Sequence, residues 1–244
     1  MGLEVDGGRR YPASPSGQVE FQFVDYSPLV LSLEVAFIAT AISLAIALLL
    51  AWALSFLDFR GKEILDAAIT LPLVLPPTVL GYYLLIVIGR ESWLGQFWES
   101  LTGSPLVFTP KAAVIAAIVH SAPLLTKYLR AAIESVDPIY VKSARSLGLP
   151  EWTIYLRVVL PLCQRAIAAA AVLAFARSLG DFGVTIMIAG NIPGKTQTLS
   201  VAIYDAVESG NSSLALWLVL IVSGIGLLVV WLANRMNPPQ ALRS

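Results

Sequence analysis

Two oppositely charged residues, Arg177 and Asp181, lie four positions apart inside an otherwise apolar stretch from Ala166 to Gly190. On a helix this spacing puts both side chains on one face, where they could form an ion pair. Arg177 could instead present its positive charge to an anion, since an ionisable group within an apolar segment is a candidate for function. We favour the ion pair, because a deep and tight anion site would hinder release of the anion.

Few other side chains could carry out chemistry on a bond. The chain has one cysteine, Cys163, and one histidine, His120, too few for an internal disulfide or a Cys/His metal cluster. We interpret both as packed helix residues. The string from Gly190 to Thr196 has three residues between its glycines and includes a proline, whereas a phosphate-binding loop needs four. We expect no catalytic residue, metal ligand or nucleotide site on this chain.

The composition is that of a membrane protein. Of the 244 residues, 57% are hydrophobic and 13% are charged, and the mean hydropathy is +0.77. Ordinary soluble domains have fewer apolar and more charged residues. The 16 basic and 16 acidic residues cancel, so no net charge draws the chain toward nucleic acid.

Runs without charged residues predict the membrane spans. Three of them, Val35–Leu57, Ala67–Gly89 and Ser209–Asn234, hold roughly 23 to 26 residues, enough to cross a hydrocarbon core about 30 Å thick. Two further spans include charged residues, and Lys127 and Arg130 could snorkel from the end of one of them. We predict an all-α, polytopic helical bundle with about five spans, at 29–57, 64–89, 111–133, 164–190 and 211–235.

The basic residues predict the orientation, because cytoplasmic loops carry an excess of lysine and arginine. Such residues follow the first span, fill the connection between the third and fourth spans, and close the chain. We therefore expect the connection, residues 134–163, and the C-terminal tail, residues 237–244, to be cytoplasmic. The polar N-terminal tail, residues 1–27, then lies outside.

The cytoplasmic connection carries helix start and stop signals. Asp137 can serve as an N-cap, Pro138 as the first helical residue and Gly148 as the residue that follows the helix. A second short helix follows, and Leu160 and Pro161 mark its end or a kink. We expect the two helices to form a compact elbow.

The first of these helices carries an apolar stripe. Tyr140, Ala144 and Leu147 fall at positions i, i+4 and i+7, beside Lys142 and Arg145. Such a stripe suits docking into the groove of a partner protein. It is equally compatible with a helix that rests on lipid headgroups.

The segment from Lys142 to Gly148, followed by Leu160 and Pro161, resembles the EAA loop of ABC importer permeases. In that family the loop is a coupling helix that inserts into a cleft of the cytoplasmic ATPase. The chain departs from the family pattern where Lys142 replaces an acidic residue and Ser143 replaces the first alanine. The resemblance assigns coupling to the ATPase to Lys142, Ala144, Arg145, Leu147 and Gly148.

Two further stretches resemble the molybdate and tungstate branch of these permeases. They are Leu71 to Tyr82 and Phe175 to Gly183, the second running on through Gly190 to Leu199. The resemblance covers about Pro28 to Arg235 and implies the type I, or MetI-like, permease fold over residues 28–236. Sulfate permeases share much of the second stretch, so the family is better defined than the substrate.

Prolines and glycines in these stretches interrupt helix hydrogen bonding, which membranes tolerate where a cavity or neighbouring helices satisfy the backbone. A kink that only improves packing is the alternative. Our candidates for pathway lining or helix breaks are Pro72, Pro76, Pro77, Gly81, Arg177, Gly180, Asp181 and Gly183. In the external loop, Asn191, Lys195 and Thr196 are candidates for contact with a binding protein, although an ordinary solvated loop would look similar.

The resemblance implies a permease that moves molybdate or tungstate inward by alternating access, in the plasma (inner) membrane of a prokaryote. It implies a homodimer with two ATPase subunits, which hold ATP and Mg²⁺, and an extracytoplasmic molybdate-binding protein. A sulfate or thiosulfate permease is the alternative within the class. A channel or secondary transporter would explain the spans but not the elbow, and a membrane-embedded enzyme lacks an evident catalytic pair.

Overall fold

The structure is a computed structural model that describes residues 26–236. All regular elements in this range are helical. They are α1 (Ser27–Phe56), α2 (Lys62–Val74), α3 (Pro77–Ile88), α4 (Trp93–Thr102), α5 (Pro110–Glu134), α6 (Pro138–Ser146), α7 (Glu151–Ile154), a π-helical turn η1 (Tyr155–Val159), α8 (Leu160–Leu179), α9 (Gly183–Ile188), α10 (Leu199–Glu208) and α11 (Ser212–Met236). The predicted C-terminal tail and nearly all of the predicted N-terminal tail lie outside the described residues.

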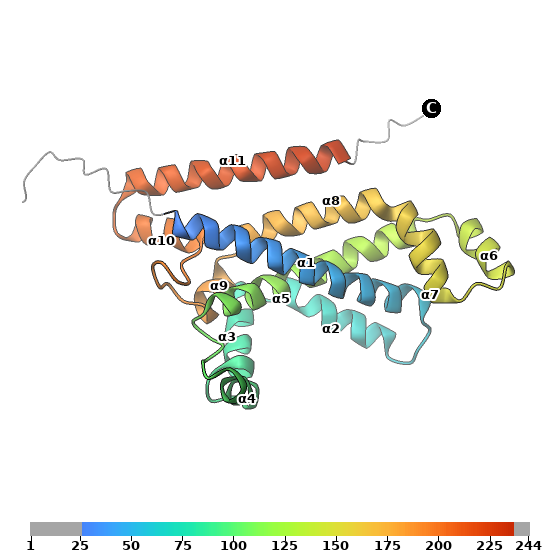
Figure 1. Cartoon of the computed structure of the whole chain (residues 1–244), viewed down its shortest axis with the longest axis horizontal. Coiled ribbons are helices and arrows are strands. Elements are labelled where there is room, and N and C mark those ends of the chain that lie inside the picture. Colours follow the sequence, from blue (N-terminus) through green and yellow to red (C-terminus); the bar gives the residue numbers. More distant parts are fainter. Residues whose placement is uncertain (1–25, 237–244) are drawn as a thin grey trace, which may run out of the picture.

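Three long helices, α1, α5 and α8, run side by side and form the centre of the bundle (Figure 1). Small residues line the α1 face that packs inward, and alanines on α5 complement them. Without bulky side chains between them, the two backbones can approach closely, as is common between helices in membranes. The buried small residues are Ala36, Ala39, Ser43, Ala47 and Ala51 on α1 and Ala112, Ala113, Ala116 and Ala117 on α5.

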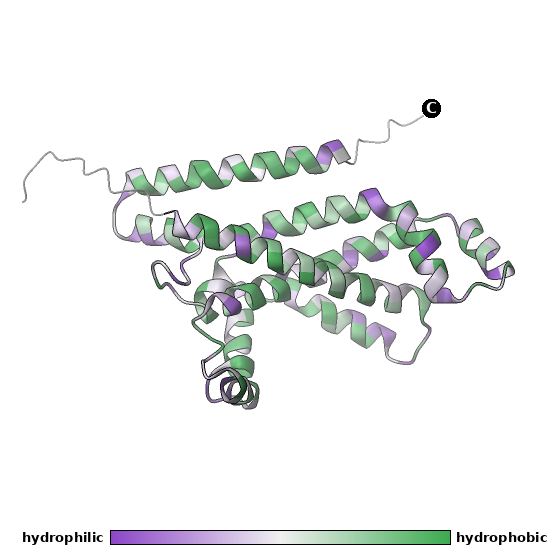
Figure 2. Ribbon diagram, viewed as in Figure 1, coloured by the Kyte–Doolittle hydropathy of each residue, from purple (hydrophilic) through white to green (hydrophobic). Residues whose placement is uncertain are grey.

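The long helices are apolar enough to span a membrane, which confirms the all-α, polytopic fold class. Ser27–Phe56, Pro110–Glu134, Glu151–Leu179 and Ser212–Arg235 qualify singly, and α2 with α3 qualify only as a bent pair. Hydrophobic residues cover the long helices, whereas many hydrophilic ones lie at the elbow, around α10 and in α4 (Figure 2). The exposed apolar faces are those that lipid or another subunit would cover.

The predicted second span is broken rather than straight. Its two halves, α2 and α3, meet at an angle of 116°, and α3 points away from the bundle (Figure 1). Pro76 is the N-cap of α3 and Pro77 its first residue, so neither has an N–H to continue α2. Pro72 does not interrupt the helix, because α2 continues through it to Val74.

The predicted fourth span, residues 164–190, does not form one helix. The helix α8 ends at Leu179, and the short helix α9 begins only at Gly183. At its other end α8 continues back through η1 to α7, so the expected second elbow helix is the bent start of this span. The bend lies where Pro161 lacks an N–H, and the preceding π-helical bond from Leu160 N to Tyr155 O shifts the hydrogen-bond register.

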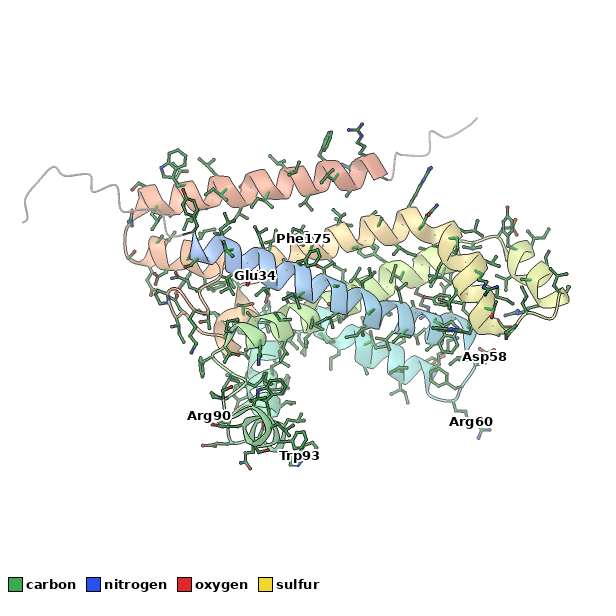
Figure 3. The ribbon with its side chains drawn as sticks, in the orientation of Figure 1. Glu34, Asp58, Arg60, Arg90, Trp93 and Phe175 are labelled. Atoms are coloured by element: carbon green, nitrogen blue, oxygen red, sulfur yellow. The ribbon has the colours of Figure 1, made fainter. Side chains whose placement is uncertain are left out.

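The molecule has two distinct ends. The elbow with α6 lies at one end, and α10 and the starts of α1 and α11 lie at the other (Figure 1). Asp58 and Arg60 mark the turn between α1 and α2 on the elbow side, while Arg90 and Trp93 lie in the lobe formed by α3 and α4 (Figure 3). Arg90 pairs with Glu99 at 2.9 Å and thereby ties the turn between α3 and α4 to α4.

Candidate functional site

The helix α6 is capped at both ends by its own sequence. The Asp137 carboxylate accepts a hydrogen bond from the Ile139 N–H at 2.9 Å. At the other end Gly148 has φ +76°, Gly148 N donates to Arg145 O at 2.9 Å, and Leu149 N donates to Ala144 O at 3.3 Å. This is the Schellman arrangement, in which a left-handed residue is needed and glycine adopts it without strain.

The three residues that we predicted to form one apolar stripe on α6 differ in burial. Ala144 is only 5% exposed and packs with Ile154 and Tyr155 inside the chain. Tyr140 and Leu147 are exposed, Leu147 by 80%. Ala144 therefore anchors α6 to the bundle, which leaves the exposed residues for contact with a partner. The role of Ala144 in coupling to the ATPase stays a prediction.

Arg145 is held by the elbow itself. Its guanidinium forms two parallel hydrogen bonds to Glu151 at the start of α7, from Nε at 2.7 Å and from Nη2 at 3.0 Å. The hydrogen bonds to the Glu151 carboxylate hold the pKa of Arg145 above its usual value. The predicted coupling residue Arg145 thus joins α6 to α7, whereas Lys142 is exposed on the same helix.

Aromatic residues connect the elbow to α1. The Trp52 and Trp152 rings meet edge to face with centroids 5.0 Å apart, and Phe56 meets Tyr155 in the same manner at 5.6 Å. The Tyr155 hydroxyl donates to Leu48 O of α1 at 2.8 Å. A displacement of the elbow would therefore be transmitted directly to α1 and α8.

A charged cluster joins α2 to α5. Lys127 and Arg130, which we expected to snorkel toward water, both reach Asp66 on α2, at 2.7 Å and 3.2 Å. Arg130 also pairs with Glu134 at 2.7 Å. These contacts fix the first half of the broken span against the central bundle.

The two interruptions of the predicted spans pack against each other. We call residues 75–81 and 180–187 together the break junction. A Cβ added to Gly183 would lie 2.6 Å from Pro77 Cβ, and one added to Gly81 would lie 2.7 Å from Met187 Cβ. The glycines therefore permit a close crossing of α3 and α9. The sequence candidates Pro77, Gly81 and Gly183 meet here, although more than 100 positions separate the last from the other two.

A chain of hydrogen bonds lies beside the break junction. The direct Arg177–Asp181 ion pair that we favoured from the sequence is not formed in the described part of the chain, because His120 of α5 stands between them. His120 Nδ1 lies 3.0 Å from Asp181 Oδ1, and Arg177 contacts His120 Nε2. Thr185 donates to the second Asp181 oxygen at 2.7 Å.

His120 is the residue that sequence reasoning misjudged. It is 8% exposed, as expected for a packed residue, but its ring is the centre of a polar network. The available signal was its position in α5, where it is the only ionisable side chain between Lys111 and Lys127. An ionisable residue in such a stretch is a candidate for function by default.

The loop that contains Asn191 and Lys195 is tied to α10. The Asn191 amide donates to Asp205 at 2.9 Å, and Gln197 donates to Asn191 at 2.9 Å. Asn191 and Lys195 are exposed and stay candidates for a binding-protein contact. Thr196 is fully buried and accepts a hydrogen bond from Ile192 N at 3.2 Å, so its assignment to that contact is corrected to an internal role.

Broken membrane helices beside a buried polar chain at one place, and an exposed, rigidly held elbow at one end, define a transport permease of the ABC class. The chain belongs to the family of binding-protein-dependent transport system inner membrane components, whose model matches residues 43–240. It is thus a multi-pass membrane protein that serves as a transport subunit.

Within this family the chain is similar to molybdenum permeases. It is 39% identical to the molybdenum transport system permease protein ModB of Escherichia coli (strain K12), over 86% of this chain and 94% of that protein. It is 32% identical to the protein named "Probable sulfate transport system permease protein cysT" of Chlorokybus atmophyticus, over 89% of this chain and 76% of that protein. The molybdenum permease is the more similar of the two.

Solved structures confirm the fold class. A bacterial alginate ABC transporter in complex with its periplasmic protein matches with a TM-score of 0.72 at 16% identity, covering 89% of this chain and 80% of that chain. The methionine transporter MetNI matches with a TM-score of 0.63 at 16% identity, covering 86% and 91%. The chain has the MetI-like fold of type I ABC importer permeases.

Proposed function

We propose that this chain forms the transmembrane pathway of an ATP-driven importer for molybdate or tungstate. In this proposal two copies of the chain pair in the inner membrane with two cytoplasmic ATPase subunits, which bind ATP and Mg²⁺. An extracytoplasmic binding protein delivers the anion and supplies most of the selectivity. The chain itself makes and breaks no covalent bond.

The observation that carries this proposal is the elbow. Its helix α6 is exposed, capped at both ends and fixed to α1 and α8 through Ala144 and the aromatic contacts of Tyr155. A channel or a secondary transporter needs no such element. A rigid, exposed helix is what a nucleotide-driven motor would require in order to move the spans, and we therefore place the elbow in the cytoplasm.

The choice of molybdate rests on similarity. The molybdenum permease of E. coli is 39% identical over 94% of its length, whereas the sulfate permease of C. atmophyticus is 32% identical over 76% of its length. Tungstate is included because it is a tetrahedral dianion like molybdate. Sulfate or thiosulfate is the second candidate, since the sulfate permease still matches over most of this chain.

Uptake into proteoliposomes tests the proposal. The chain would be reconstituted with the ATPase and the molybdate-binding protein of the same organism, and accumulation of molybdate would be measured with and without ATP. We expect uptake only when all components and ATP are present. Uptake by the chain alone would instead establish a channel or secondary transporter, and stimulation of ATP hydrolysis by a sulfate-loaded binding protein only would establish a sulfate permease.

A further inference from the structure

Arg177 is an exposed charged residue within one of the membrane-spanning helices, where such residues are rare. Its side chain is exposed on the surface of the single chain, in the last turn of α8. Figure 1 shows that α8 ends short of the end of the bundle where α1 and α11 begin, so the last turn of α8, which carries Arg177, lies at a depth that those two helices also span. An exposed arginine at such depth faces a water-filled cavity or another subunit rather than lipid.

The hydrogen-bond partners of His120 determine which of its ring nitrogens carries the hydrogen. Arginine has only donors, so Arg177 must donate to His120 Nε2, and that nitrogen must carry a lone pair. The hydrogen of the ring then lies on Nδ1 and is donated to the Asp181 carboxylate. The His120 ring therefore links the Asp181 carboxylate to the Arg177 guanidinium and transmits the orientation of one to the other.

Asp181, at the buried end of this hydrogen-bonded network, is held by further hydrogen bonds. The Thr185 hydroxyl donates to the free oxygen of Asp181, and the Ser200 hydroxyl donates to the Asp181 backbone carbonyl at 2.7 Å. The Asp181 side chain is 3% exposed and that of His120 is 10% exposed. A buried pair, Asp181 and His120, that holds an exposed arginine residue is the arrangement of a positioned donor.

We propose that Arg177 contacts the oxyanion as it passes and that His120 and Asp181 are positioning residues that aim the guanidinium into the pathway. One of the five N–H groups of Arg177 is used by His120, which leaves a fork suited to the oxygens of a tetrahedral dianion. The inference rests on the proposed function and adds the site that handles the substrate.

The charge balance removes the objection that an arginine in the membrane would trap the anion. The Asp181 carboxylate and the Arg177 guanidinium lie at opposite ends of one hydrogen-bonded network, so their formal charges oppose each other. Its exposed end offers hydrogen-bond donors without an excess positive field. Such a contact guides a dianion and still releases it.

A carboxylate of the second copy is the rival occupant of the free N–H groups. Glu34 is an exposed acid of α1 (Figure 3). Its carboxylate could accept hydrogen bonds from the guanidinium of the other copy. A subunit contact of this kind would make Arg177 necessary for dimer formation. An anion contact would make it necessary for delivery of the anion in a dimer that still assembles.

The test uses the complete complex in proteoliposomes and measures molybdate uptake together with ATP hydrolysis stimulated by the loaded binding protein. For Arg177→Gln we expect intact assembly, retained stimulation and uptake lowered about tenfold or more, the loss typical of a missing charge-assisted hydrogen bond. Arg90→Gln is the matched control, since Arg90 pairs with Glu99 in the lobe of α3 and α4, and should transport as the wild type does.

His120→Asn tests the positioning role. The asparagine amide can still donate toward Asp181 but offers Arg177 no acceptor at the position of Nε2. We expect uptake to fall as in Arg177→Gln, and the double variant to be no worse than Arg177→Gln alone, because both changes remove one function. Losses that multiply in the double variant would overturn the assignment of His120.

Wild-type uptake by Arg177→Gln would overturn the anion contact directly. Loss of the dimer in Arg177→Lys, which keeps the positive charge, would favour the subunit contact. If Arg177→Gln does not assemble, Arg177→Lys decides: reduced uptake in an assembled complex supports the oriented fork, and unchanged uptake refutes it. Failure of the wild-type complex to accumulate molybdate would instead refute the proposed function.

Discussion

At the scale of single residues, the break junction depends on two positions without a side chain. Gly183 faces the ring of Pro77, and Gly81 faces Met187. A proline ring cannot rotate away from an added atom, whereas a methionine side chain has some freedom to move. Gly183 is therefore the more sensitive of the two.

Gly183→Ala should destabilise the chain by about 1–3 kcal/mol, the usual cost of overpacking a rigid contact. The measurement is the thermal unfolding midpoint of the purified protein in detergent. Gly224→Ala is the control, because an added Cβ there meets no atom within 4 Å and alanine favours a helix. Equal midpoints for the two variants would contradict the close crossing of α3 and α9.

The sequence indicated two residues of the hydrogen-bonded network formed by Arg177, His120 and Asp181, but not how they are connected. Arg177 and Asp181 were evident from the sequence because charges inside an apolar stretch are costly. Their helical spacing suggested a direct pair, yet spacing along one helix does not reveal a third residue from another helix. His120 belongs to α5, and only the packing of α5 on α8 brings its ring between the two charges.

At the scale of elements, the elbow was predictable because its signals are local. The caps at Asp137 and Gly148 follow from side-chain and backbone chemistry within a few residues. The breaks of the spans were less predictable. Hydropathy does not distinguish one straight helix from α2 with α3, since the apolar residues continue across that break. At the break between α8 and α9 the charged residues Arg177 and Asp181 were evident, but they do not reveal that the helix ends at Leu179.

Arg145 and Glu151 allow a test of how the elbow is held. Either Arg145→Glu or Glu151→Arg places like charges together and removes the bidentate contact between α6 and α7. The direct effect on stability is small, at most about 1 kcal/mol for an exposed pair. The orientation of α6 should nevertheless change, and we expect both single variants to lower ATP-driven uptake.

The exchanged pair, Arg145→Glu with Glu151→Arg, should restore uptake, because it re-forms the contact with the net charge unchanged. Recovery in the double variant would place the role of Arg145 inside the elbow. If the double variant stays as defective as Arg145→Glu alone, Arg145 contacts the ATPase directly, as the family resemblance suggested.

At the scale of the whole molecule, the two ends differ in kind. The elbow end carries the exposed helix α6 and the cluster around Asp66, Lys127 and Arg130. The opposite end carries a loop tied by Asn191 and Asp205. This division matches the use of one end for a motor and the other for delivery of the substrate, and it makes the orientation of the chain a decisive property.

Cysteine labelling in intact cells tests that orientation. In a Cys163→Ser background, which keeps a hydroxyl donor where the thiol meets Ala132 O at 3.3 Å, single cysteines would replace Leu147 on the elbow or Lys195 in the opposite loop. Both positions are exposed, so reactivity depends on the side of the membrane. A maleimide that cannot cross the membrane should label Lys195→Cys directly and Leu147→Cys only after permeabilisation, because the excess of basic residues predicts a cytoplasmic elbow. Labelling of Leu147→Cys in intact cells would place α6 outside, where no ATPase could reach it.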